Sequence, residues 1–179
     1  MQLTDLDIAI LRIVNGNFSP YVSLFFVFAN YFLYALVFIL VLNLWATKQK
    51  KKMIHLLFVL ALGLLLVYSL KYLINRPRPY ETFPDINAGI NKGDPSFPSA
   101  HVFTSFLCLY FLPKRPKTIK ILAITYLVFL IPIGSLYIGI HYPSDVLIAA
   151  ILGSLFPILL PEKTVLGQFK KHHIFNISL

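Results

Sequence analysis

The sequence predicts an all-α fold: a polytopic bundle of about five transmembrane helices with an N-terminal interfacial helix. Three observations support this fold class. The chain has 179 residues, of which 58% are hydrophobic, and its mean hydropathy of +0.75 is too high for an ordinary soluble core. Apolar runs long enough to cross roughly 30 Å of hydrocarbon recur along the chain. Basic residues gather at the ends of these runs, which favours a bilayer and lipid headgroups as partners, not nucleic acid.

Residues 1–20 are expected to lie at the membrane interface. Four apolar side chains share one face of a helix over 3–14, with the charged residues elsewhere. The segment is too polar to span a bilayer, and it has neither the basic start nor the small-residue cleavage pattern of a signal peptide. The apolar face consists of Leu3, Leu6, Ile10 and Ile13.

Five apolar segments define a transmembrane core at 21–160. The first two are long enough to cross the membrane as helices, whereas the third and fifth are short. Residues 161–179 are expected to form a cytoplasmic tail, so that 1–179 is one membrane domain. The spans are expected at 22–46, 53–75, 99–113, 119–140 and 144–160.

The positive charges predict the orientation of this core. Outside the polar loop 76–98, basic residues concentrate in 47–52, in 114–120 and in the tail. With five spans, these three segments lie on the same side, which the positive-inside rule makes cytoplasmic. The loop 76–98 and the turn HYPSD at 141–145 then face the extracytoplasmic side of the cytoplasmic membrane.

Several polar groups at this outer face are not explained by topology. Each alone is compatible with a structural role, such as a snorkelling lysine or a helix cap. Together they indicate function, because ionisable groups at membrane depth are costly and usually functional. The group consists of Lys71, Arg76, Arg78, Ser99, His101, His141 and Asp145.

This combination of side chains suits phosphate chemistry. Cations beside a helix N-terminus, with Ser99 and the backbone N–H groups that follow it, form a site for phosphate oxygens. One neutral imidazole can attack phosphorus while a carboxylate orients it, and a second, protonated imidazole can donate to the leaving oxygen. If the fifth helix begins at the turn, His141 and Asp145 share one of its faces. No metal site is predicted, because His172 and His173 have no clustered third ligand.

Three ordered motifs carry a resemblance to a known family. KYLINRPRP at 71–79, PSAH at 98–101 and GSLYIGIHYPSD at 134–145 resemble KxxxxxxRP, PSGH and SRxxxxxHxxxD, the signatures of the type 2 phosphatidic acid phosphatase superfamily. The resemblance implies a metal-independent membrane phosphatase with a helical core, no cofactor and an outward-facing site, related to vanadium haloperoxidases. It also implies individual roles. His141 would be the nucleophile, His101 the general acid and Asp145 the orienting carboxylate, with phosphate bound by Lys71, Arg78, Ser99 and the backbone of Ala100.

The chain departs from these signatures at two places. Ala100 replaces a glycine, which narrows the allowed φ. Ser135 stands where the family has an arginine six residues before the nucleophile, and losing such a charge-stabilising donor can cost a few kcal/mol in the transition state. Arg76 or Lys92 are the candidates to supply the missing charge.

The leading interpretation is an outward-facing lipid phosphatase that acts on a membrane-embedded phosphomonoester or diphosphate. A lipid-to-lipid phosphotransferase is its mechanistic neighbour. A non-enzymatic lipid-phosphate binder or carrier is the competing class, and the absent arginine favours it. The sequence admits a phosphorylated glycerolipid, a polyprenyl diphosphate or lipid A as the lipid, and it does not define an oligomeric state.

Overall fold

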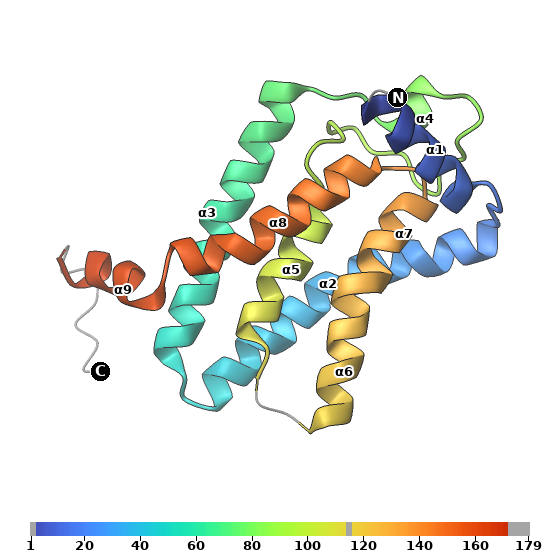
Figure 1. The fold of residues 1–179 in the computed structure, drawn as a ribbon. Coiled ribbons are helices and arrows are strands. Elements are labelled where there is room, and N and C mark those ends of the chain that lie inside the picture. Colours follow the sequence, from blue (N-terminus) through green and yellow to red (C-terminus); the bar gives the residue numbers. More distant parts are fainter. Residues whose placement is uncertain (1–2, 114–115, 172–179) are drawn as a thin grey trace.

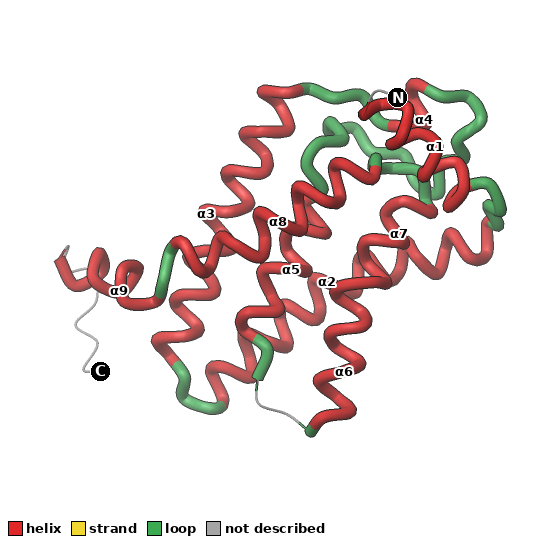
Figure 2. Tube along the Cα trace, in the orientation of Figure 1, coloured by secondary structure: helices red, strands yellow, loops and turns green. Residues whose placement is uncertain are grey.

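The computed structural model describes residues 3–113 and 116–171, and all regular elements in this part of the chain are helical (Figure 2). The all-α prediction is therefore confirmed. In chain order the elements are α1 (Leu3–Asn15), α2 (Pro20–Ala46), α3 (Lys50–Ile74), α4 (Pro79–Thr82), α5 (Ala100–Phe111), α6 (Lys117–Thr125), the π-helix η1 (Tyr126–Leu130), α7 (Ile131–Tyr137), α8 (Pro143–Leu159) and α9 (Glu162–Lys171).

Helix α5 is the centre of the bundle (Figure 1). It packs against α2, α3, α8 and η1, and Val102, Phe103 and Leu107 on it are fully buried. Gly153 of α8 allows the two backbones to meet, because a Cβ there would lie 2.3 Å from the carbonyl oxygen of Phe103. The first turns of α5 and α8 are joined by a hydrogen bond from Ser99 N to the carbonyl oxygen of Asp145 (3.4 Å). This packing brings the motifs at 98–101 and 141–145 to the same end of the bundle.

Three helices are long and apolar enough to cross a membrane: α2, α3 and the continuous helix of α6, η1 and α7. Their exposed side chains are largely apolar, including Phe25, Phe28 and Phe38 of α2, as expected for a surface in contact with lipid. Helices α5 and α8 are apolar but shorter. The 12 residues of α5 extend about 18 Å at 1.5 Å per residue, so five complete crossings stay a prediction.

The helix boundaries agree with the predicted spans to within about three residues, with two differences. The fourth span contains the π-turn η1 directly before Pro132, as expected near a residue that cannot donate a backbone hydrogen bond. The sequence predicts only a tail after residue 160, whereas helix α9 begins at Glu162 and packs against α3, burying Val165.

Helix α1 covers the end of the bundle at which α5 and α8 begin. Leu11 is fully buried in a cluster with Ile86 and Tyr142, and Arg12 forms an ion pair with Asp85 at 2.7 Å. The predicted interfacial face keeps Leu6, Ile10 and Ile13 exposed. The α2–α3 connection, the end of α5 and the start of α6 lie at the opposite end of the bundle (Figure 1), and Lys114 and Arg115 are outside the described residues.

Candidate active site

A polar cavity of about 60 Å³ lies where α5 and α8 begin. Its walls come from α2, α3, the 75–99 loop, the first turn of α5 and the α7–α8 turn. The lining residues are Tyr34, Tyr68, Lys71, Arg78, Lys92, Asp94, Ala100, His101, Ile140 and His141.

His141 lies in the turn before α8, which begins at Pro143, so the condition under which His141 and Asp145 would share one face of that helix is not met. Gly139 makes this turn possible, because its φ is +72° and a Cβ there would lie 2.3 Å from the carbonyl oxygen of Asn87. The turn nevertheless holds His141 Nδ1 at 3.6 Å from Asp145 Oδ2. The position of the His141 imidazole relative to the Asp145 carboxylate is therefore set by two segments together: the α7–α8 connection and the first helical turn of α8.

Asp145 is fully buried, and two neighbouring groups donate to its Oδ2 oxygen. Tyr142 N donates to Oδ2 at 2.9 Å, and the Ser96 hydroxyl donates to the same oxygen. Ser96 Oγ also lies 3.5 Å from His141 Nδ1, so one buried serine contacts both members of the His–Asp pair. The carboxylate is consequently held in one orientation beside the imidazole.

The imidazole of His141 is neutral near pH 7. Burial lowers the pKa of His141 to about 4, although the hydrogen bond to Asp145 and the charge of Asp145 act in the opposite direction. A neutral imidazole keeps a lone pair, which a nucleophilic nitrogen requires. With Nδ1 facing Asp145, Nε2 is the nitrogen left for this role.

The cations Lys71 and Arg78 share a single carboxylate. Asp94 Oδ2 lies 3.1 Å from Lys71 Nζ and Asp94 Oδ1 lies 2.7 Å from Arg78 Nη2. Burial raises the pKa of Asp94, but the charges and hydrogen bonds of Lys71 and Arg78 outweigh burial and hold it below its usual value. Both cations are almost fully buried. Their charge at this end of the cavity is already paired with the Asp94 carboxylate.

Backbone carbonyls hold the same two cations. Arg78 donates to the carbonyl oxygen of Asp94 at 2.8 Å and to that of Ile140 at 2.7 Å. Lys71 Nζ donates to the carbonyl oxygen of Pro95 at 2.5 Å. The position of both side chains is therefore defined by groups other than the Asp94 carboxylate.

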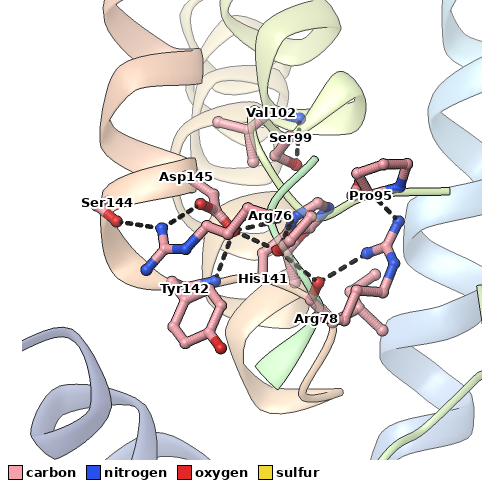
Figure 3. A network of polar contacts seen from close by, with 12 residues as sticks. Arg76, Arg78, Pro95, Ser99, Val102, His141, Tyr142, Ser144 and Asp145 are labelled. Carbon is pink, nitrogen blue, oxygen red and sulfur yellow. Dashed lines mark hydrogen bonds and ion pairs between the residues drawn. The ribbon is translucent and has the colours of Figure 1, made fainter. Parts of the chain in front are cut away.

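Arg76 lies on the side of His141 opposite to Arg78 (Figure 3). Its guanidinium contacts Asp145 Oδ1 at 2.6 Å and Asp7 Oδ2 at 2.9 Å, and it stacks 3.7 Å from the centre of the Tyr142 ring. Arg76 does not line the cavity, because two carboxylates draw it behind the His–Asp pair. This position differs from the phosphate-binding position that the sequence predicts.

Ser99 and Ser135 also point away from the cavity. Ser99 Oγ accepts from Val102 N at 3.5 Å and so caps α5 (Figure 3). Ser135 is fully buried, and its hydroxyl contacts the carbonyl oxygen of Ile131 at 2.9 Å and Asn30 Oδ1 at 3.4 Å. Neither serine lines the cavity, and the predicted contact of the Ser99 hydroxyl with phosphate stays a prediction.

His101 and Lys92 also line the cavity. His101 Nε2 lies 3.1 Å from the Tyr34 hydroxyl. The backbone of Lys92 is bracketed by the Tyr80 hydroxyl, which accepts from Lys92 N at 2.9 Å and donates to Lys92 O at 3.0 Å. Because these two hydrogen bonds fix the backbone of Lys92, its side chain lines the cavity from a defined position in the loop.

Sequence reasoning missed three acidic or hydroxyl side chains of this network: Asp7, Asp94 and Ser96. Asp94 and Ser96 lie just before the PSAH motif, and this proximity is the sequence feature that could have indicated their place in the site. Asp7 has no such feature beyond its charge. Within 3–113 and 116–171, no group of three His, Cys, Asp or Glu residues is arranged to hold a metal ion, and His172 and His173 lie outside the described residues.

Several known proteins are similar to this chain in sequence or in fold. The bacitracin transport permease protein BcrC of Bacillus licheniformis is 30% identical over 166 residues, covering 87% of this chain and 79% of that protein. LpxE of Aquifex aeolicus superimposes with a TM-score of 0.76 at 29% identity, covering 89% of this chain and 98% of LpxE. A transmembrane PAP2 type phosphatidylglycerolphosphate phosphatase from Bacillus subtilis gives 0.72 at 25% identity, covering 98% and 89%. Residues 52–163, which include all three motifs, match the PAP2 superfamily, and the chain therefore belongs to that superfamily.

Proposed function

We propose that this chain hydrolyses a phosphomonoester or diphosphate of a membrane lipid, without a metal ion, through a phosphohistidine on His141. One observation carries the proposal: a neutral imidazole, oriented by a buried carboxylate, lines the same cavity as two buried cations and a second histidine. The name of the Bacillus subtilis relative, a phosphatidylglycerolphosphate phosphatase, supports a lipid phosphomonoester as substrate. The lysines with which α3 begins, Lys50 to Lys52, and those in the first turn of α6, Lys117 and Lys120, lie at the opposite end of the bundle (Figure 1) and support an extracytoplasmic site.

In this reaction His141 Nε2 attacks phosphorus, an N–P bond forms and the bond from phosphorus to the lipid oxygen breaks. Asp145 accepts the hydrogen bond of Nδ1–H and stabilises the positive charge that develops on the ring. His101, in its protonated form, donates a proton to the leaving oxygen. Water then attacks the phosphohistidine and gives a proton to the neutral His101; the P–O bond forms, the N–P bond breaks, phosphate leaves and both imidazoles return to their starting forms.

Three cations are assigned to the phosphoryl oxygens. Lys71 and Arg78 are held by backbone carbonyls beside the cavity, and charge-assisted bonds from such preorganised donors stabilise the transition state. Lys92 is the third, and its side chain takes the place of the arginine that Ser135 replaces. Arg76 is assigned to Asp145, which it keeps ionised and oriented.

The decisive experiment is phosphate release from short-chain lipid phosphomonoesters and lipid diphosphates in detergent, without added metal. The wild-type protein should turn over, and radiolabelled substrate should leave phosphate on the protein after rapid denaturation. His141→Ala should abolish both signals. His101→Ala should still become labelled by a substrate with a good leaving group, since the acid acts on the leaving oxygen. Full turnover in His141→Ala would refute the assignment.

A lipid-phosphate carrier is the second candidate. The name of the Bacillus licheniformis relative, a transport permease protein, and the absence of an arginine at position 135 favour this function. A carrier would bind lipid phosphate tightly in the same detergent assay and release no inorganic phosphate. The two functions are therefore separated by one measurement of binding and turnover on the same preparation.

A further inference from the structure

Asp94 occupies the place where the two buried cations would receive a phosphate. Its carboxylate bridges Lys71 and Arg78 at 3.1 and 2.7 Å and lines the cavity that contains His141. Resting on the proposed function, we propose that Asp94 is a specificity-determining residue that excludes phosphodiester headgroups of bulk lipid and yields only to a terminal phosphate.

The cavity is open to lipid headgroups from the side of the membrane. Tyr34 of α2 and Tyr68 of α3 line it, and they are 55% and 43% exposed on two helices that carry the lipid-facing surface. These helices diverge from their connection at the other end (Figure 1). A phosphatase at this depth is therefore surrounded by phosphodiesters in large excess over its substrate.

A bare pair of buried cations would bind these phosphodiesters. A phosphodiester carries one negative charge and two unesterified oxygens, whereas a terminal phosphate carries up to about two charges and three oxygens. An aspartate that is part of the loop competes at the high effective concentration of a tethered group. The aspartate carries the same charge as a phosphodiester, so a phosphodiester gains little binding free energy by displacing the aspartate. A terminal phosphate brings additional negative charge and one more acceptor oxygen, and its binding to the two cations is therefore more favourable.

The loop permits this exchange of anions. The Asp94 side chain is 27% exposed, and a Cβ at the adjacent Gly93 would meet nothing within 4 Å, so there is space for the carboxylate to swing away. Lys71 and Arg78 stay in place when it does, because the carbonyl oxygens of Pro95 and Ile140 continue to hold them. The vacated position belongs to the same cavity that His141 lines.

The test compares Asp94→Asn with Asp85→Asn, a matched change in the same loop at an exposed aspartate paired with Arg12. Hydrolysis of a short-chain lipid phosphomonoester is measured in uncharged detergent micelles with increasing phosphatidylglycerol, and diacylglycerol serves as the dilution control. Wild type and Asp85→Asn should slow equally with either additive. Asp94→Asn should have a lower KM without phosphatidylglycerol and be inhibited by it at least about tenfold more strongly, as expected if the carboxylate occupies the cations about nine-tenths of the time.

Equal sensitivity of wild type and Asp94→Asn to phosphatidylglycerol, or a raised KM in Asp94→Asn, would overturn the proposal. Thermal unfolding checks that the variant is folded, and Asp94→Ser replaces it if it is not; failure of both to fold would make Asp94 a structural residue and also overturn the idea. Absence of turnover in the wild type would count against the proposed function alone. In that case, displacement of bound inorganic phosphate by phosphatidylglycerol is measured instead, because it reports the same competition of anions for Lys71 and Arg78.

Discussion

Removal of the Ser96 hydroxyl is expected to weaken catalysis without weakening substrate binding. Ser96 is fully buried, and its hydroxyl donates to Asp145 Oδ2 and lies 3.5 Å from His141 Nδ1. Ser96→Ala deletes one oxygen and leaves the rest of the loop intact. The carboxylate keeps its bonds from Tyr142 N at 2.9 Å and from Arg76 at 2.6 Å, so it is loosened and not expelled.

The size of the effect follows from the charge of the acceptor. A hydrogen bond to a charged group contributes about 1.5–3 kcal/mol, and each 1.36 kcal/mol in the barrier is a factor of ten in rate. If the whole contribution is expressed when the imidazole becomes positively charged, kcat falls about 10- to 150-fold. KM should change little, because Ser96 does not line the cavity. The effect therefore belongs to the orientation of the His–Asp pair.

The assay is steady-state phosphate release in detergent, accompanied by thermal unfolding. Ser105→Ala is the control, because Ser105 is equally buried but donates only within its helix, to the carbonyl oxygen of Val102 at 2.8 Å. Ser105→Ala should lose some stability and keep its kcat. A kcat of Ser96→Ala within twofold of wild type, or a raised KM at constant kcat, would refute the positioning role.

Three further outcomes are expected. The acid limb of kcat/KM should lie near pH 4, because protonation of His141, whose pKa burial lowers to about 4, removes the nucleophile; a limb that moves with the substrate's own phosphate pKa would instead report the substrate. Asn87→Cys should react with an impermeant thiol reagent from outside and Gln49→Cys should not, over a low background since Cys108 is buried; the reverse labelling would invert the topology. Lys92→Gln should lower kcat/KM at least about tenfold and Lys92→Arg should retain it, whereas equal rates would remove Lys92 from the site.

The long helices were predictable because hydrophobic length is a local property of the sequence. Segments 22–46 and 53–75 contain enough apolar residues to require burial in lipid wherever they lie, and the structure has α2 and α3 there. Helix α9 was missed because its 10 residues follow a span and carry mixed polarity, which sequence reasoning assigns to a solvated tail.

The contacts around the His–Asp pair were only partly predictable, for a different reason. The motifs place Lys71, His101 and His141 at the same ends of neighbouring spans, so their convergence follows from topology. The Ser96–Asp145 contact joins residues 49 apart, and the Asp7–Ser144 contact joins residues 137 apart. Such contacts depend on the path of an irregular loop and on the docking of α1, which hydrophobic periodicity does not encode.

The absent arginine becomes intelligible once these loop contacts are in place. Ser135 faces Asn30 at the contact between α7 and α2, and Asn30 shares a second, small cavity with Lys92 and His101. An arginine at 135 would have to pass Asn30 to reach that space, whereas Lys92 of the 83–99 loop already lines it. A lysine supplies a point charge without the planar fork of a guanidinium. In the proposed reaction, phosphate orientation would therefore depend on the guanidinium of Arg78, which lines the cavity and which the carbonyl oxygens of Asp94 and Ile140 hold in place.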